Sequence, residues 1–164
     1  MRNLALLLTL VFIGCQSRKD SDFTFYKWSI HESYYLKFNS ADTIYYINTY
    51  PFEEKTSYTI LKSDEKDKIQ NILDSISFPK KKISFSNSVN DGVTYAFNLK
   101  ENNKSKKLKI HAGAGPNQFW IFGKSLEEIK NNHKFIEIKK VFNLSEIDSM
   151  VMVYVKPIEK NNGH

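Results

Sequence analysis

Aromatic and β-branched residues alternate with polar ones in short runs through the first half of the chain. Such runs, separated by turn-forming residues, are typical of β-strands. They predict four strands, at Phe23–Ile30, Ser33–Phe38, Asp42–Tyr50 and Thr56–Leu61. A helical spacing of isoleucine and leucine follows, with acidic residues in its first turn, and predicts a helix over about Asp64–Ser75 with Ser63 as its N-cap.

The second half repeats this order. Alternating runs predict strands at Lys82–Asn87, Val93–Leu99, Lys107–His111 and Lys134–Ile138. Asn90-Asp91-Gly92 predicts a hairpin turn between the first two of them, because glycine tolerates a positive φ. The apolar segment Ser149–Val155 predicts a further, buried strand.

A helix is expected after the small-residue turn Ala112–Gly115, ending near Asn132. Its apolar stripe consists of Phe119, Phe122, Leu126 and Ile129, with Trp120 and Ile121 on a flank. Glycine inside a helix costs about 1 kcal/mol, so Gly123 indicates close packing against the sheet.

These elements predict an α+β fold: an antiparallel sheet of about six to eight strands with two main helices, in which strands followed by a helix occur twice. We expect one globular domain over residues 23–156 and a frayed tail over residues 157–164.

The N-terminus differs in kind from the rest of the chain. Arg2 precedes an uninterrupted apolar run, Leu4–Ile13, and then Gly14 and Cys15. As a helix this run would be about 15 Å long, half of a bilayer core of roughly 30 Å, which favours a secretory signal over a membrane span. Cys15 is the only cysteine of the chain, so no disulfide is expected.

The Gly-Cys ending of this run resembles the lipobox of bacterial lipoproteins. The resemblance implies cleavage of residues 1–14, lipidation of Cys15 and a short tether over residues 15–22. Gln16 in the following position implies sorting to the outer membrane, on its periplasmic side or at the cell surface, and the charged residues after it resemble export signals of Bacteroidota. An ordinary signal peptide with an incidental cysteine is the alternative.

The chain carries a formal net charge of +6 from 24 basic and 18 acidic residues, and the basic residues are almost all lysine. A solvated lysine-rich surface is the simplest interpretation. Attraction to anionic lipid or cell-wall polymer is the functional alternative, carried by Lys80–Lys82, Lys104, Lys106, Lys107 and Lys109. No nucleic-acid partner is expected, because sequence-specific sites favour arginine.

Two nucleotide motifs are incomplete at the same residue. Gln118 stands where both the phosphate-binding loop ending in Gly123-Lys124-Ser125 and the dinucleotide fingerprint beginning at Gly113 require glycine. We therefore expect no nucleotide ligand and no cofactor.

The four histidines are scattered and have no metal-ligand spacing, and no serine-nucleophile motif is present. Glu53-Glu54 and Glu127-Glu128 are adjacent pairs whose members point in different directions, unlike an acid/base pair across a cleft. The sequence therefore predicts neither a metal site nor catalytic residues, and indicates that the protein is not an enzyme.

The first functional hypothesis is a membrane-anchored, non-catalytic envelope lipoprotein that binds a protein or cell-wall polymer. The candidate binding surface comprises Trp120, His111 and Asn117, and one tyrosine of each pair, Tyr34-Tyr35 and Tyr45-Tyr46, is expected to face solvent or a partner. An inhibitor or immunity lipoprotein that neutralises a toxin or hydrolase is the alternative, and an enzyme of unfamiliar type is a second one.

Three Asp-Ser/Thr-apolar tripeptides resemble the O-glycosylation sites of Bacteroidota. The resemblance implies that Thr43, Ser75 and Ser149 are acceptors where they are exposed.

Overall fold

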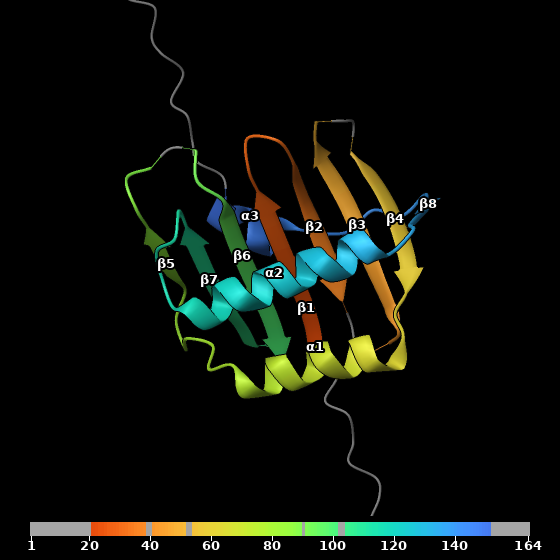
Figure 1. Cartoon of the computed structure of the whole chain (residues 1–164), viewed down its shortest axis with the longest axis horizontal. Coiled ribbons are helices and arrows are strands. Elements are labelled where there is room, and N and C mark those ends of the chain that lie inside the picture. Colours follow the sequence, from red (N-terminus) through yellow and green to blue (C-terminus); the bar gives the residue numbers. More distant parts are fainter. Residues whose placement is uncertain (1–20, 39–40, 52–53, 90, 102–103, 152–164) are drawn as a thin grey trace, which may run out of the picture.

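The structure, a computed structural model, describes residues 21–38, 41–51, 54–89, 91–101 and 104–151. Eight strands form a single sheet in the order β5-β7-β6-β1-β2-β3-β4-β8, and three helices pack on it (Figure 1). The elements, in chain order, are β1 (Ser21–Trp28), β2 (Ser33–Phe38), β3 (Thr43–Tyr50), β4 (Lys55–Ile60), α1 (Ser63–Ser75), β5 (Ile83–Ser86), β6 (Thr94–Glu101), β7 (Lys104–His111), α2 (Asn117–Asn132), β8 (Ile136–Ile138) and α3 (Ser145–Val151).

The expected α+β fold is confirmed, including the order of strands followed by a helix in both halves. The sheet is mixed, because β5 lies parallel to β7 while the other pairs are antiparallel. Lys62, not Ser63, caps α1, and its backbone N–H donates to the carboxylate of Glu65.

The expected hairpin at residues 90–92 is wrong. β6 pairs with β1 on one side and β7 on the other, so β5 can join the sheet only beyond β7. Gly92 is instead required by close packing, since a Cβ there would lie 2.5 Å from the Cβ of Ala112. The positive φ angles occur in the following turn, at Ala112 (51°), Gly113 (78°) and Gly115 (94°).

One face of the sheet packs against α1 and α2 and forms the larger core. Phe119, Phe122, Leu126 and Ile129 are all buried there, as the helical stripe predicts. The ring of Phe97 stacks against Phe122 at 5.8 Å between centroids. The expectation for Gly123 is also confirmed, because a Cβ at this position would lie 2.4 Å from the ring of Tyr95.

The other face is covered by α3 and the segment before it, which lie behind the sheet in Figure 1. Tyr35, Ile47 and Ile147 form the centre of this smaller core. Tyr45 packs on Phe142, with ring centroids 4.8 Å apart. The expected exposed tyrosine face is therefore wrong: Tyr34 and Tyr35 are both buried, and Tyr45 and Tyr46 are half-buried.

The strand expected at Ser149–Val155 is wrong over its first three residues. They belong to α3, whose Ile147 and Met150 lie one turn apart and both point into the smaller core. An apolar run of this length suits a buried helix face as well as a buried strand. Residues 152–155, and the tail expected at 157–164, lie outside the described residues.

The strand β1 begins at Ser21, two residues earlier than expected, since Ser21 and Asp22 pair with Glu101 and Lys100. The expected tether thus extends into the sheet at its last two residues. We call the end of the sheet where β1 begins the lower end and the end where β1 turns into β2 the upper end, as they are drawn in Figure 1. The helix α1 lies along the lower end.

Replacement of Gly123 by alanine tests the close contact between α2 and the sheet. We expect Gly123→Ala to lower the free energy of unfolding by about 1–3 kcal/mol, because overpacking against Tyr95 outweighs the gain in helix propensity. Urea unfolding measures this change in the free energy of unfolding. Lys124→Ala, at the exposed neighbouring position, is the control and should change stability by less than about 0.5 kcal/mol. An equally small change in Gly123→Ala would contradict the contact.

Candidate functional site

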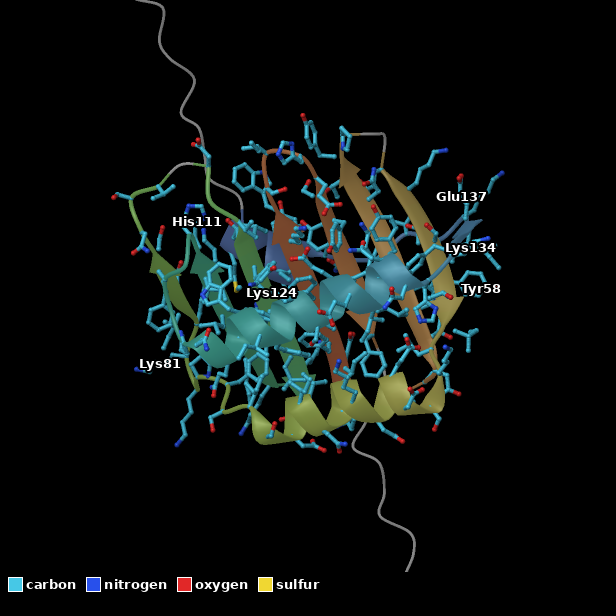
Figure 2. All side chains as sticks on the ribbon, in the orientation of Figure 1. Tyr58, Lys81, His111, Lys124, Lys134 and Glu137 are labelled. Atoms are coloured by element: carbon cyan, nitrogen blue, oxygen red, sulfur yellow. The ribbon has the colours of Figure 1, made fainter. Side chains whose placement is uncertain are left out.

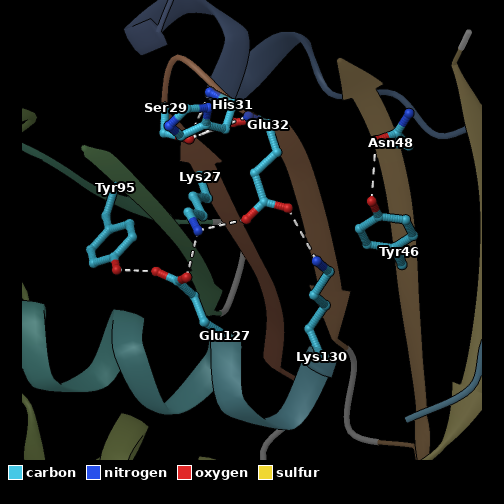
Figure 3. A network of polar contacts seen from close by, with 9 residues as sticks. All are labelled: Lys27, Ser29, His31, Glu32, Tyr46, Asn48, Tyr95, Glu127 and Lys130. Atoms are coloured by element: carbon cyan, nitrogen blue, oxygen red, sulfur yellow. Dashed lines mark hydrogen bonds and ion pairs between the residues drawn. The ribbon is translucent and has the colours of Figure 1, made fainter. Parts of the chain in front are cut away.

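A group of four charged side chains, Lys27, Glu32, Glu127 and Lys130, joins the upper part of the sheet to α2 and is here called the Lys27 cluster (Figure 3). Lys27 is buried and the other three are half-buried. The Nζ of Lys27 lies 2.7 Å from Oε1 of Glu32 and 2.5 Å from Oε2 of Glu127. Glu32 also accepts from Lys130, 3.2 Å from its Oε2. Two cations and two carboxylates therefore neutralise one another, in a place where an isolated charge would be costly.

Three tyrosines surround this cluster. The hydroxyl of Tyr95 donates to Glu127, and the ammonium of Lys130 lies 4.8 Å from the ring centroid of Tyr34 and 5.5 Å from that of Tyr46. The hydroxyl of Tyr34 is fully buried and has no hydrogen-bond partner among the described residues. Burial and the charges of Glu127 and Glu32 raise the pKa of Tyr34, so it stays protonated.

The cluster favours the charged forms of Glu32 and Lys27. Burial works against the charge of Glu32, but hydrogen bonds from Lys27 and Lys130 outweigh it and lower the pKa of this carboxyl group. Burial likewise opposes the charge of Lys27, and its bonds to Glu127 and Glu32 raise its pKa. A general acid needs a carboxyl group whose pKa is raised towards the working pH. The pKa of Glu32 is shifted in the opposite direction.

Beside the cluster, a broad groove of about 790 Å³ opens on the α2 face at the upper end of the sheet. Glu32 of the cluster and Tyr46 beside it both line the groove. Tyr50, half exposed, and the exposed ion pair between Lys55 and Glu137 complete its outer part. Figure 2 labels Glu137 at the edge of the sheet formed by β4 and β8.

A pocket of about 590 Å³ lies at the same upper end but on the α3 face, and we call it the Trp28 pocket. Its lining comprises Tyr26, Trp28, Ser86, Asn87, Ser88, Val89, Thr94, Lys109, His111 and Val151. Both ring nitrogens of His111 are engaged, one 2.8 Å from the Thr94 hydroxyl and the other 2.6 Å from the Val89 carbonyl. His111 therefore fixes the rim of this pocket (Figure 2).

The three residues of the expected binding surface do not form one site. His111 lies on the α3 face, whereas Trp120 is on α2, across the sheet. Trp120 packs on Tyr95 with ring centroids 5.0 Å apart and donates its indole N–H to the Ala114 carbonyl at 3.0 Å. Asn117 is exposed at the first position of α2. Of the three, His111 lines the Trp28 pocket.

Cys15 lies outside the described residues. Of the three glycosylation-like positions, Ser75 and Ser149 are exposed near the ends of α1 and α3, and Thr43 is half-buried at the start of β3. Ser75 and Ser149 each donate their hydroxyl to a carbonyl of the preceding helical turn, at 3.0 Å.

Among the described residues, none of the helices combines the length and apolar character needed to span a membrane. In the same part of the chain, no group of three or more His, Cys, Asp or Glu side chains is arranged to hold a metal ion. Comparisons of the chain with protein-family models, with curated proteins and with solved structures gave no match.

The Lys27 cluster was missed by the sequence analysis, which weighed Glu127 only against its neighbour Glu128. Lys27 and Glu127 are a hundred residues apart, and only the packing of α2 brings them together. One signal was present: in β1, alternation places Lys27 on the same face as Phe23 and Phe25, both aromatic. A lysine in such a strand indicates a buried cation and hence a partner.

The cluster predicts strong energetic coupling between Lys27 and Glu127. Lys27→Met and Glu127→Gln should each lower the free energy of unfolding by about 3 kcal/mol, because each leaves a buried charge with fewer partners. In urea unfolding, the double variant should lose less stability than the sum of the two single losses. The difference, which is the coupling energy, should be about 1–3 kcal/mol. The exposed pair Lys55→Met and Glu137→Gln is the control, with a coupling below about 1 kcal/mol. Additive losses at Lys27 and Glu127 would contradict the cluster.

The lowered pKa of Glu32 predicts an acid-sensitive contribution to stability. A carboxyl whose pKa is lower in the folded than in the unfolded chain stabilises the fold above its unfolded pKa, and this contribution disappears as the pH falls through the folded pKa. Between about pH 7 and pH 3 the stability of Glu32→Gln should therefore fall less than that of the unaltered protein. Glu137→Gln, at an exposed carboxylate, should follow the unaltered protein. Parallel curves for Glu32→Gln and Glu137→Gln would refute the assignment.

Proposed function

We propose that this chain is a lipid-anchored, non-catalytic binding protein of the bacterial envelope, attached through Cys15. Its binding surface is the upper end of the sheet, and its partner is a protein or a cell-wall polymer. The observation that carries the proposal is where the first strand begins relative to the two cavities. β1 begins at the lower end of the sheet, whereas the groove and the Trp28 pocket both open at the upper end.

The lengths of the tether and of β1 support this orientation. From Cys15 to Ser21 an extended chain reaches at most about 20 Å, which keeps the lower end near the membrane. The eight residues of β1 then span about 26 Å. A surface at the upper end is thus carried away from the lipid and is accessible to large partners.

The chemistry of the upper end supports binding over catalysis. Glu32 is held ionised by two lysines, and both nitrogens of His111 are used within the fold. Aromatic side chains of the kind found at interfaces remain, the exposed Tyr50 on one face and the half-buried Trp28 on the other. Gln16 after the lipidated cysteine leads us to propose the outer membrane as the location.

The anchor is tested by labelling cells with a fatty acid and separating their membranes. The unaltered protein should carry the label and sediment with membranes, whereas Cys15→Ala should be unlabelled and remain uncleaved. Two or more acyl chains give stable attachment, so a salt wash should not release the protein. Unlabelled protein recovered in the soluble fraction would overturn the anchor and leave the binding surface to be judged separately.

The binding surface is tested by affinity capture from solubilised envelopes with matched variants. Tyr50→Ala, at the upper end, should reduce partner recovery several-fold, whereas Ile60→Ala, equally exposed at the lower end of β4, should not. A secreted toxin or hydrolase among the captured proteins would favour the inhibitor alternative. Equal recovery with both variants would overturn the assignment of the upper end.

A further inference from the structure

The Trp28 pocket differs from the groove in the state of its aromatic side chains. Trp28 makes no aromatic contact, and its indole N–H donates no hydrogen bond within the described part of the chain. The other tryptophan, Trp120, is fully engaged with Tyr95 and the Ala114 carbonyl. Half-buried tryptophans usually find a partner for their N–H, so Trp28 offers an unused ring face and an unused donor to a ligand.

The remaining wall of the pocket is polar, and its side chains can donate and accept further hydrogen bonds. Asn87 donates its amide to the Ala112 carbonyl at 2.8 Å, which leaves its side-chain oxygen available. Lys109 donates to the Met150 carbonyl at 3.2 Å, and an ammonium group has two more donors. Ser88 adds a hydroxyl group that both donates and accepts.

The charge among the lining residues is positive. Lys109 is the only charged residue among the lining residues, which include no carboxylate. Both ring nitrogens of His111 are already engaged by Thr94 and Val89. The pocket therefore favours a ligand with a negative charge and disfavours a cation.

We propose that the Trp28 pocket binds an acidic saccharide, one or two sugar rings carrying a carboxylate. The apolar C–H face of the sugar lies on Trp28, its hydroxyl groups bond to Asn87 and Ser88, and its carboxylate meets Lys109. Hydroxyl groups, which donate and accept, match a wall that offers both. The volume of about 590 Å³ is within the usual range of roughly 300–1,000 Å³ for small-ligand pockets.

This inference deepens the proposed binding function by naming a ligand class for one face of the upper end, and it does not depend on the lipid anchor. A failure of sugar binding would leave partner capture at the groove intact. A failure of capture would leave the sugar titration unaffected. The two proposals can therefore be judged separately.

The test uses the fluorescence of Trp28. The chain has two tryptophans, so Trp120→Phe leaves Trp28 as the single reporter in the full-length protein. We expect saturable changes in its emission on titration with a glucuronic-acid disaccharide, at about tenfold lower Kd than with the corresponding neutral glucose disaccharide. Lys109→Met in the same background should remove this preference. Lys104→Met, at the exposed far end of β7, should retain it.

Three results of these titrations would overturn the proposal: no saturable change with the acidic sugar, equal affinity for both sugars, or a preference that survives Lys109→Met. A further control variant lacks residues 152–164, which follow Val151 at the pocket wall. A shift of the Trp28 emission on this removal, without added sugar, would assign the pocket to the chain itself and likewise overturn the proposal. Thermal unfolding of each variant establishes that it is folded.

Discussion

The position of α2 on the sheet depends on one side chain, Tyr95. Its ring lies so close to the helix axis that only glycine fits at position 123, and its hydroxyl donates to Glu127 one turn later. Glu127 in turn accepts from Lys27 of β1. Steric contact and charge thus fix the same helix at adjacent turns, which sets where the Lys27 cluster and the groove beside it lie.

The second face of the sheet is also covered, by α3 and the segment before it. The short helix α3 and Phe142 cover Tyr35 and Tyr45, so the tyrosine pairs serve the two cores. The surface that we propose for binding lies where the covering elements end. At the upper end α3 stops at Val151, which leaves the Trp28 pocket, and the groove opens beside the cluster on the α2 face.

Charged side chains have different surroundings in the Lys27 cluster and in the Trp28 pocket. In the Lys27 cluster every ionic group has a partner within the fold, so its contribution is to hold α2 and the β1–β2 turn together. In the Trp28 pocket a single ammonium group faces no carboxylate among the lining residues. The neutralised charges contribute to the fold, whereas the ammonium group at the pocket wall is the basis of the ligand preference that we propose.

The sequence by itself determined most of the elements, because the periods of alternation and of the helical stripe are local properties. It placed the stripe of α2, from Phe119 to Ile129, and the need for close packing at Gly123. The tertiary structure alone decided the crossover that puts β5 beyond β7, the helical state of Ser149–Val151, and the burial of the tyrosines. It also assembled Lys27 with Glu127 and Trp28 with Lys109. These depend on contacts between distant segments, and one sequence carries no local signal for which segments meet.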